Sequence, residues 1–177
     1  MDCNPELIAA AQNNTAKLGF SDRFALHTGE LADTRFLENL RMEASPVQLV
    51  MANPPWRLVG SGRLPATEAR RKALFGDKGT FPLFASAASS LLEEDGRFAC
   101  IISPDRLQDM LAALDGAGLT PYLLQYIHKQ KTSPATFVLI EARKGAHAKP
   151  SVAEPIALYG PECFFTLESL AFCPFLR

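Results

Sequence analysis

The spacing of hydrophobic residues divides the first third of the chain into alternating helices and strands. Asn4 followed by Pro5 is typical of a helix start, and the apolar residues that follow lie mostly on one helical face up to Gly19. The pattern then predicts three further elements: a short strand at about 23–28, a polar helix near 33–42 and an apolar strand over 47–52.

The rest of the chain continues this alternation after a long connection over 57–79, which is rich in glycine and charge and in which we expect little order. Thr80 and Pro82 open a helix that runs to Asp95-Gly96, and a strand follows over 97–102. Three elements complete the pattern: a helix that begins after Ser103-Pro104 and stops at Gly116 and Gly118, and two β-rich runs, 122–128 and 136–142, that suit a hairpin.

Strands that alternate with helices predict an α/β fold, with a mostly parallel sheet covered on both faces and an antiparallel hairpin at one edge. Ligands of such sheets bind outside the carboxyl ends of the strands. The apolar strand over 47–52 ends directly at Asn53, so we expect a site there.

Composition limits what this site can be. The chain has 177 residues, 47% of them hydrophobic, which suits one domain with a substantial core. Its formal net charge of −1 gives no general attraction for nucleic acid, so any such contact must be local. The spacing of the four cysteines suggests neither a metal site nor a disulfide framework. With no apolar run of membrane-spanning length and no basic, apolar leader in residues 1–20, we expect a cytoplasmic protein that contacts no membrane.

The turn after this strand reads Asn53-Pro54-Pro55-Trp56. The two prolines make the backbone rigid, because each fixes its own φ angle and lacks an N–H. The amide of Asn53, the nearby carbonyl of Pro54 and the ring of Trp56 together suit a planar amine, which they would clamp and stack upon. The alternative is that Asn-Pro-Pro merely ends a strand, as these residues often do.

Four stretches in order carry a resemblance to a known family: Asp2-Cys3-Asn4-Pro5-Glu6, His27-Thr28-Gly29-Glu30-Leu31, Asn53-Pro54-Pro55-Trp56 and Glu94-Asp95-Gly96-Arg97-Phe98. They resemble successive motifs of S-adenosylmethionine-dependent amino-methyltransferases. The likeness is greatest to the bacterial tRNA(Val) adenine-N6 methyltransferase type, whose chains end in a segment similar to 158–168 and 175–176. The resemblance implies a Rossmann-like methyltransferase fold, with 1–177 as one methyltransferase domain and 146–177 as its C-terminal extension.

The resemblance also implies S-adenosylmethionine as cofactor and N6-methylation of adenine in tRNA. Asn53, Pro54, Pro55 and Trp56 would be the catalytic residues, with the substrate amine donating to the Asn53 oxygen and the Pro54 carbonyl. Methylation of DNA adenine or of protein glutamine uses the same motif and stays open as an alternative. A non-catalytic remnant of the fold is a further alternative.

Acidic residues supply the implied cofactor contacts. Asp2 matches the acid that accepts hydrogen bonds from the ribose hydroxyls, and Glu30 matches the acid beside the cofactor's adenine, with Asp33 as a rival. Asn53 would also touch the cofactor. For Asp2 the alternative is a frayed charge at the chain end.

Basic residues gather in the loop after the turn, where the family meets its substrate. They are Arg57, Arg63, Arg70, Arg71 and Lys72, with Lys129 and Lys131 as a second cluster. Contact with the phosphates of tRNA is the functional interpretation, and a merely solvated loop is the alternative.

The family's first motif, a strand followed by a Gly-rich turn, has no counterpart, because the chain begins at the second motif. In the strand order of this fold, 3-2-1-4-5-7-6, the missing strand and most of the second lie between the strands at 23–28 and 47–52. We therefore expect a truncated form that is unstable, pairs its strands unusually or borrows strands from another chain.

Overall fold

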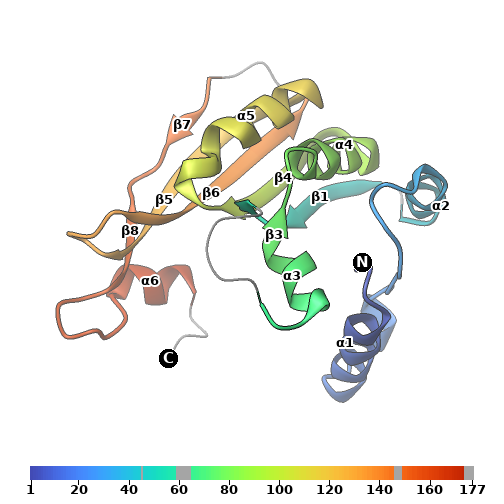
Figure 1. Ribbon diagram of the computed structural model, residues 1–177, viewed down its shortest axis with the longest axis horizontal. Coiled ribbons are helices and arrows are strands. Elements are labelled where there is room, and N and C mark those ends of the chain that lie inside the picture. The colour runs from blue at the N-terminus through green and yellow to red at the C-terminus, as the bar shows by residue number, and fades with distance from the viewer. Residues whose placement is uncertain (45, 59–64, 146–148, 174–177) are drawn as a thin grey trace. The chain divides into compact units, whose positions relative to one another are not determined.

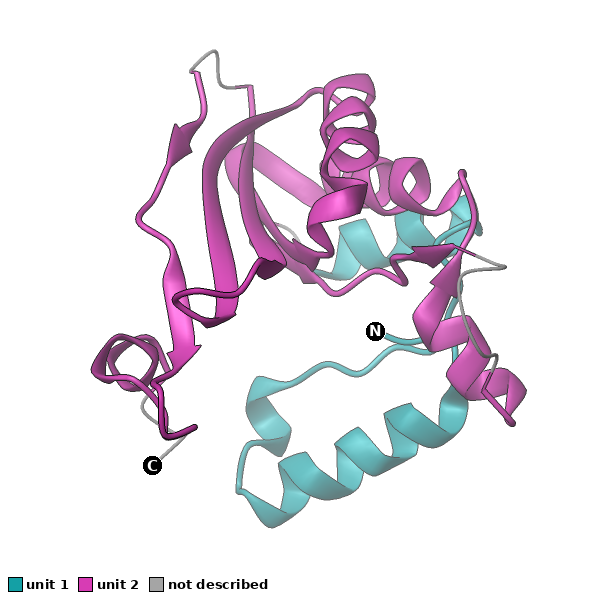
Figure 2. Ribbon diagram, turned by 60° about the vertical axis from the view of Figure 1, so that its left-hand side comes forward, with its two compact units in different colours: residues 1–44 teal, residues 45–177 magenta. Residues whose placement is uncertain are grey.

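The computed structural model describes residues 1–44, 46–58, 65–145 and 149–173. The chain forms two compact units, residues 1–44 and 45–177, which Figure 2 colours separately. The regular elements of unit 1 are helical, whereas unit 2 holds all the strands.

Unit 1 contains the two predicted helices. Helix α1 spans Pro5–Lys17, and the side chain of Asn4 accepts a hydrogen bond from the backbone N–H of Glu6, which confirms the predicted N-cap. Helix α2 spans Thr34–Ala44, close to the predicted 33–42. A 3-10 turn, η1, lies between them at Ser21–Arg23.

The prediction of a strand at 23–28 is wrong, because no strand forms there. This segment holds the end of η1 and one isolated parallel bridge, in which Thr28 lies opposite Asp2. The N–H of Asp2 donates to the carbonyl of His27, and the N–H of Gly29 donates to the carbonyl of Asp2. The reason is that a strand needs a paired neighbour along its length, and α1 begins only three residues after Asp2.

Unit 2 is built on a mixed sheet (Figure 1), in the order β1-β4-β6-β5-β7, with β8 also pairing with β5. Its strands are β1 Val47–Ala52, β4 Leu92–Ile102, β5 Leu119–Gln130, β6 Ala135–Lys144, β7 Ser151–Val152 and β8 Ile156–Tyr159. Strands β1 and β4 are parallel, β6 pairs antiparallel with both β4 and β5, and β7 and β8 run parallel to β5.

The sequence therefore predicted the apolar strand β1 and the hairpin β5–β6 correctly. The hairpin does not form the edge of the sheet, however, because β7 and β8 pair with its outer strand. Both come from the segment expected to be a C-terminal extension, whose residues 146–148 and 174–177 lie outside the described part of the chain. Helix α6, Leu167–Phe172, follows β8.

One face of the sheet is covered by two helices, α4 at Thr80–Leu91 and α5 at Leu107–Gly116, which lie side by side in Figure 1. Alternate residues of β4 and β6 point into this core, because successive side chains of a strand face opposite ways. The core includes Phe81, Ala85, Phe98, Cys100, Ile102, Met110, Leu114, Val138, Ile140 and Ala142. Cys100 is buried among them, and burial raises the pKa of its thiol to about 12.

Strand β1 pairs only with β4 among the described residues. The side chains of Leu49 and Met51 point away from the core and are 43% and 75% exposed. In contrast, Val50 and Ala52 pack against the core.

The connection after β1 is more ordered than expected. Strand β2, Arg57–Leu58, pairs in parallel with β3, Phe75–Gly76, and helix α3 spans Glu68–Leu74 between them. The Thr67 side chain caps α3, which explains a helix start within a polar segment. Gly60, Gly62 and Arg63 lie outside the described residues.

Candidate functional site

The turn Asn53-Pro54-Pro55-Trp56 follows β1 at the carboxyl end of the strand, beside the carboxyl end of β4. Ala52, the last residue of β1, lies opposite Cys100 in the parallel ladder. Pro54 is fully buried, whereas Asn53 is exposed, and no described residue is hydrogen-bonded to its side-chain amide. The turn is therefore anchored by a proline and offers an unused amide.

Trp56 is held on one side by the protein. Its ring meets that of Phe137, near the start of β6, edge to face, with centroids 6.2 Å apart and an angle of 72° between planes. The guanidinium of Arg57 lies 5.3 Å from the centre of the indole ring. Trp56 also packs against the hydrophobic core, so only part of its ring is free to meet a ligand.

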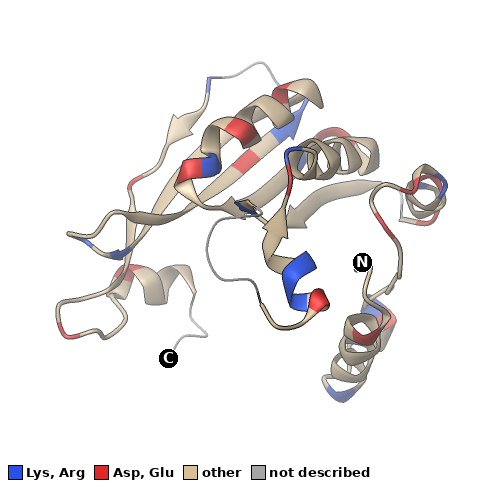
Figure 3. Cartoon of the chain, in the orientation of Figure 1, with Lys and Arg blue, Asp and Glu red and all other residues tan. Residues whose placement is uncertain are grey.

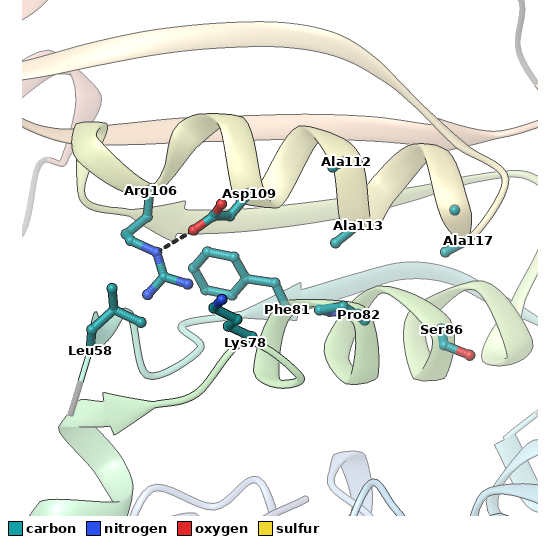
Figure 4. Close-up of a pocket in the computed structure, with 11 residues that line it drawn as sticks. Leu58, Lys78, Phe81, Pro82, Ser86, Arg106, Asp109, Ala112, Ala113 and Ala117 are labelled. Carbon is teal, nitrogen blue, oxygen red and sulfur yellow. Dashed lines mark hydrogen bonds and ion pairs between the residues drawn. The ribbon is translucent and has the colours of Figure 1, made fainter.

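Arg106 connects the turn to the helical layer. It belongs to the 3-10 turn η2, Pro104–Arg106, which follows β4. Its Nη1 donates to the backbone oxygen of Trp56 at 2.8 Å, and its Nε donates to Oδ2 of Asp109 at 2.7 Å. The guanidinium also lies 4.6 Å from the centre of the Phe81 ring. Figure 4 shows Arg106 beside Phe81 and joined to Asp109.

Gly76 lets β3 approach the turn closely. A Cβ atom on Gly76 would lie 2.5 Å from the Pro55 carbonyl oxygen and 2.6 Å from Oγ1 of Thr80. Both distances are too short for any side chain, so only glycine fits without a shift of the backbone. The turn thus lies against β3 on one side and Arg106 on the other.

A hollow of about 610 Å³ lies between α4 and α5, close to Arg106. Mostly small and apolar residues line it: Leu58, Lys78, Phe81, Pro82, Ser86, Arg106, Asp109, Ala112, Ala113, Gly116 and Ala117. Asn53 is not among them. The hollow therefore borders the residues that support the turn and does not lie over the amide.

The candidate cofactor acids belong to unit 1, whereas Asn53 belongs to unit 2. Asp2 uses its Oδ1 to accept the N–H of Asn4 at 2.8 Å. Glu30 is exposed. Its rival Asp33 accepts the N–H of Phe36 at the start of α2, and therefore has a structural role as a helix cap.

Six of the predicted basic residues are described, and all six are exposed: Arg57, Arg70, Arg71, Lys72, Lys129 and Lys131. Arg70, Arg71 and Lys72 lie on α3, where Figure 3 shows basic residues in blue. Lys72 is 3.9 Å from Glu68, one helical turn earlier. In the second cluster, Lys129 lies at the end of β5 and Lys131 in the hairpin turn.

Within the described ranges, no helix has both the length and the apolar composition to cross a lipid bilayer. The described side chains also form no group of three or more His, Cys, Asp or Glu residues that could hold a metal ion.

Sequence reasoning missed three residues that support the turn: Gly76, Arg106 and Phe137. A signal existed for Arg106, because it follows a buried strand whose carboxyl end meets that of β1 at one sheet edge. Gly76 and Phe137 gave no such signal, because their contacts with the turn depend on the path of the chain between 57 and 79 and on the register of the hairpin.

Comparison with known proteins shows the fold. No family model matches the chain, and no curated protein is similar to it in sequence. Among solved structures, it is similar to a predicted O-methyltransferase from Agrobacterium tumefaciens, with a TM-score of 0.69 and 20% identity, over 98% of this chain and 73% of that one.

Two further solved structures are similar. One is an O-methyltransferase family 2 protein from Planctomyces limnophilus, with a TM-score of 0.51 and 16% identity, over 81% of this chain and 41% of that one. The other is a modification subunit of a putative type I restriction enzyme from Vibrio vulnificus, with a TM-score of 0.50 and 13% identity, over 93% of this chain and 37% of that one. The chain thus spans less than half of each of these two proteins. These likenesses show that the chain has the Rossmann-like methyltransferase fold.

Proposed function

We propose that this chain belongs to a cytoplasmic, S-adenosylmethionine-dependent methyltransferase that acts on the N6 amine of adenine in tRNA. The observation that carries the proposal is the exposed Asn53 amide at the carboxyl end of β1. It makes no hydrogen bond within the described chain, and it lies in a turn that two prolines make rigid. An unused polar group held in place at a ligand-binding edge is what a catalytic acceptor requires.

The reaction follows from the geometry of an amine. S-adenosylmethionine supplies a methyl group on a positively charged sulfur. If the substrate amine donates one hydrogen to the exposed Asn53 oxygen, and the second to the Pro54 carbonyl once a movement of the turn uncovers this buried residue, the nitrogen lone pair turns out of the ring plane and becomes the nucleophile. Neither contact removes a proton before the attack. The methyl group would pass to the nitrogen as its bond to sulfur breaks, S-adenosylhomocysteine would leave, and the methylated amine would then release one proton to solvent. Placement of the amine therefore supplies most of the rate.

The residues proposed for the cofactor fit its chemistry. Asp2 keeps Oδ2 without a partner among the described residues, and an ionised carboxylate is a good acceptor for the two hydroxyls of a ribose. Glu30 is exposed and makes no contact that would compete with a ligand among the described residues. Asn53 would meet both the cofactor and the substrate.

The substrate side of the turn suits a flat base. The half-buried Trp56 ring is fixed by Phe137, so an adenine that has left its stack would meet a surface already in place. Arg57 and the α3 residues Arg70, Arg71 and Lys72 are exposed cations that follow the turn in the chain. We assign to them contacts with the tRNA phosphates.

Calorimetry with S-adenosylmethionine, followed by transfer of a labelled methyl group, tests this proposal. The acceptors are bacterial tRNA, double-stranded DNA and a glutamine-containing protein, and digestion with mass spectrometry identifies the methylated group. We expect cofactor binding and N6-methyladenine in tRNA. Label in DNA or protein would overturn the tRNA assignment, and the absence of cofactor binding would favour a non-catalytic remnant.

A further inference from the structure

We propose that Arg106 is a positioning residue for the turn that holds Asn53, and that it acts through the carbonyl of Trp56. The kinetic part of this inference rests on the proposed function. Its structural part does not, because it concerns how the turn is held in the protein without any ligand.

The contacts of Arg106 join three separate segments. Its side chain is only 6% exposed and bonds to the Trp56 oxygen, which lies 50 residues earlier in the chain. Asp109 of α5 accepts a hydrogen bond from Nε. Phe81 of α4, which is itself 1% exposed, lies against the guanidinium. The turn is thereby tied to the helical layer that covers the sheet.

Such a contact is strong and directional. A hydrogen bond from a charged guanidinium to a carbonyl is about twice as strong as one between neutral groups. A buried cation also needs its partners, since leaving it without them is costly. Because Asp109 and Phe81 fix the plane of the guanidinium, the two N–H bonds of Nη1 point in fixed directions, and one of them is donated to the Trp56 oxygen.

The turn needs an anchor at this end. Pro54 and Pro55 fix the dihedral angles within the turn, but they do not fix where the turn lies as a whole. Besides the packing of Pro54 and the close approach of β3 to Pro55, that position is set at its two ends, by β1 before Asn53 and by the hydrogen bond from Arg106 at Trp56. A displacement of about 1 Å at a reacting group can cost roughly 100-fold in rate, so the second anchor bears directly on catalysis.

Trp56 is the only tryptophan of the chain, so its fluorescence reports on the turn directly. We compare Arg106→Gln and Arg106→Lys with Arg143→Lys as the matched control. Arg143 likewise lies over an aromatic ring, 3.8 Å from the centre of that of Tyr122, but its backbone lies opposite Arg97 in the middle of β4 and not at the strand end that leads to Arg106. Acrylamide quenching, the emission maximum and the kinetics of methyl transfer are measured for each.

We expect Arg106→Gln to raise the quenching of Trp56 and to lower kcat by roughly 10- to 100-fold, with KM for S-adenosylmethionine changed by less than about twofold. Arg106→Lys keeps a donor and should recover part of both effects. Arg143→Lys should leave the fluorescence of Trp56 unchanged.

Because Arg106 is buried, its variants could fail to fold for reasons unrelated to the turn. A variant of its exposed partner, Asp109, separates the two effects. Asp109 is 61% exposed, so Asp109→Ala should keep the fold while it frees Nε, and should shift the Trp56 fluorescence in the same direction by less. The proposal is overturned if Arg106→Gln and Asp109→Ala both leave Trp56 quenching and kcat as in the unaltered protein. If the unaltered protein transfers no methyl group, the proposed function fails, and the fluorescence comparison alone decides the role of Arg106.

Discussion

The ring of Trp56 meets the ring of Phe137 edge to face, 6.2 Å between centroids, although the two residues lie far apart in the sequence of unit 2. One follows β1 and the other lies near the start of β6. Edge-to-face pairs of this kind contribute about 0.5–1.5 kcal/mol beyond burial. The indole is therefore oriented by the protein before any substrate arrives.

Replacement of Trp56 by alanine should weaken substrate binding most. Stacking of one base on an aromatic side chain contributes about 1–3 kcal/mol, so the dissociation constant for tRNA should rise by roughly 5- to 150-fold. Fluorescence anisotropy of labelled tRNA measures this dissociation constant for the variant and the unaltered protein.

Phe137→Leu is the matched control for Trp56→Ala, because it removes the edge support and keeps the indole. It should raise the dissociation constant less than Trp56→Ala does. Equal affinities of Trp56→Ala and the unaltered protein would show that no base stacks on this ring.

Substitution of Gly76 by alanine should destabilise the fold next to the turn. The added Cβ would lie 2.5 Å from the Pro55 oxygen, and overpacking of this kind costs about 1–3 kcal/mol in the free energy of unfolding. Gly116→Ala is the control, since a Cβ there meets nothing within 4 Å and should be neutral or mildly stabilising. Urea unfolding curves compare them, and similar midpoints for both variants would contradict the close approach of β3.

The basic residues of α3 should control the salt dependence of tRNA binding. Replacing Arg70, Arg71 and Lys72 by glutamine should lower affinity, because fewer phosphates are then neutralised by the protein. Affinity falls as salt rises, so the slope of log affinity against log salt concentration is negative. This slope should become shallower by about 1 for each phosphate that these side chains no longer neutralise. Titrations of labelled tRNA at several salt concentrations measure this slope.

The control for the α3 variant is the same change at three exposed cations of unit 1, Lys17, Arg35 and Arg41, which alters the net charge equally. If both triple variants lose affinity alike, the effect comes from overall charge and α3 is not a phosphate-binding surface.

The buried thiol of Cys100 predicts a loss of stability in alkali. Burial raises its pKa from 9.0 to about 12, so above pH 9 the unfolded chain releases the proton while the folded chain keeps it. The free energy of unfolding should therefore fall by up to about 1.4 kcal/mol per pH unit between pH 9 and 12. Cys100→Ala should show a shallower slope in the same range, and an unchanged slope would contradict the buried, neutral thiol.

Much of the fold could be predicted from the sequence because strong local signals marked it. The cap at Asn4, the apolar run of β1 and the alternating residues of the β5–β6 hairpin each specify an element without help from distant residues. The prediction of a strand at 23–28 was wrong because that element depends on a distant partner and not on local signals alone. Its residues suit a strand, but a strand forms only along a partner, and only Asp2 pairs with this segment among the described residues.

The candidate site shows the same division. The turn from Asn53 to Trp56 is contiguous in the chain and could be found from its residues alone. The residues that support it come from distant segments, and Arg106, Gly76 and Phe137 reach the turn only after the sheet has assembled. Sequence patterns within one segment cannot show such contacts.

The central claim is that the Asn53 amide accepts a hydrogen bond from the amine that is methylated. The most direct test is the single-turnover rate of methyl transfer from S-adenosylmethionine to tRNA for Asn53→Ala beside the unaltered protein. Since Asn53 is exposed and makes no hydrogen bond with the described chain, stability should not change, while the rate should fall by roughly 100- to 1,000-fold. An unchanged rate in the folded variant would contradict the claim.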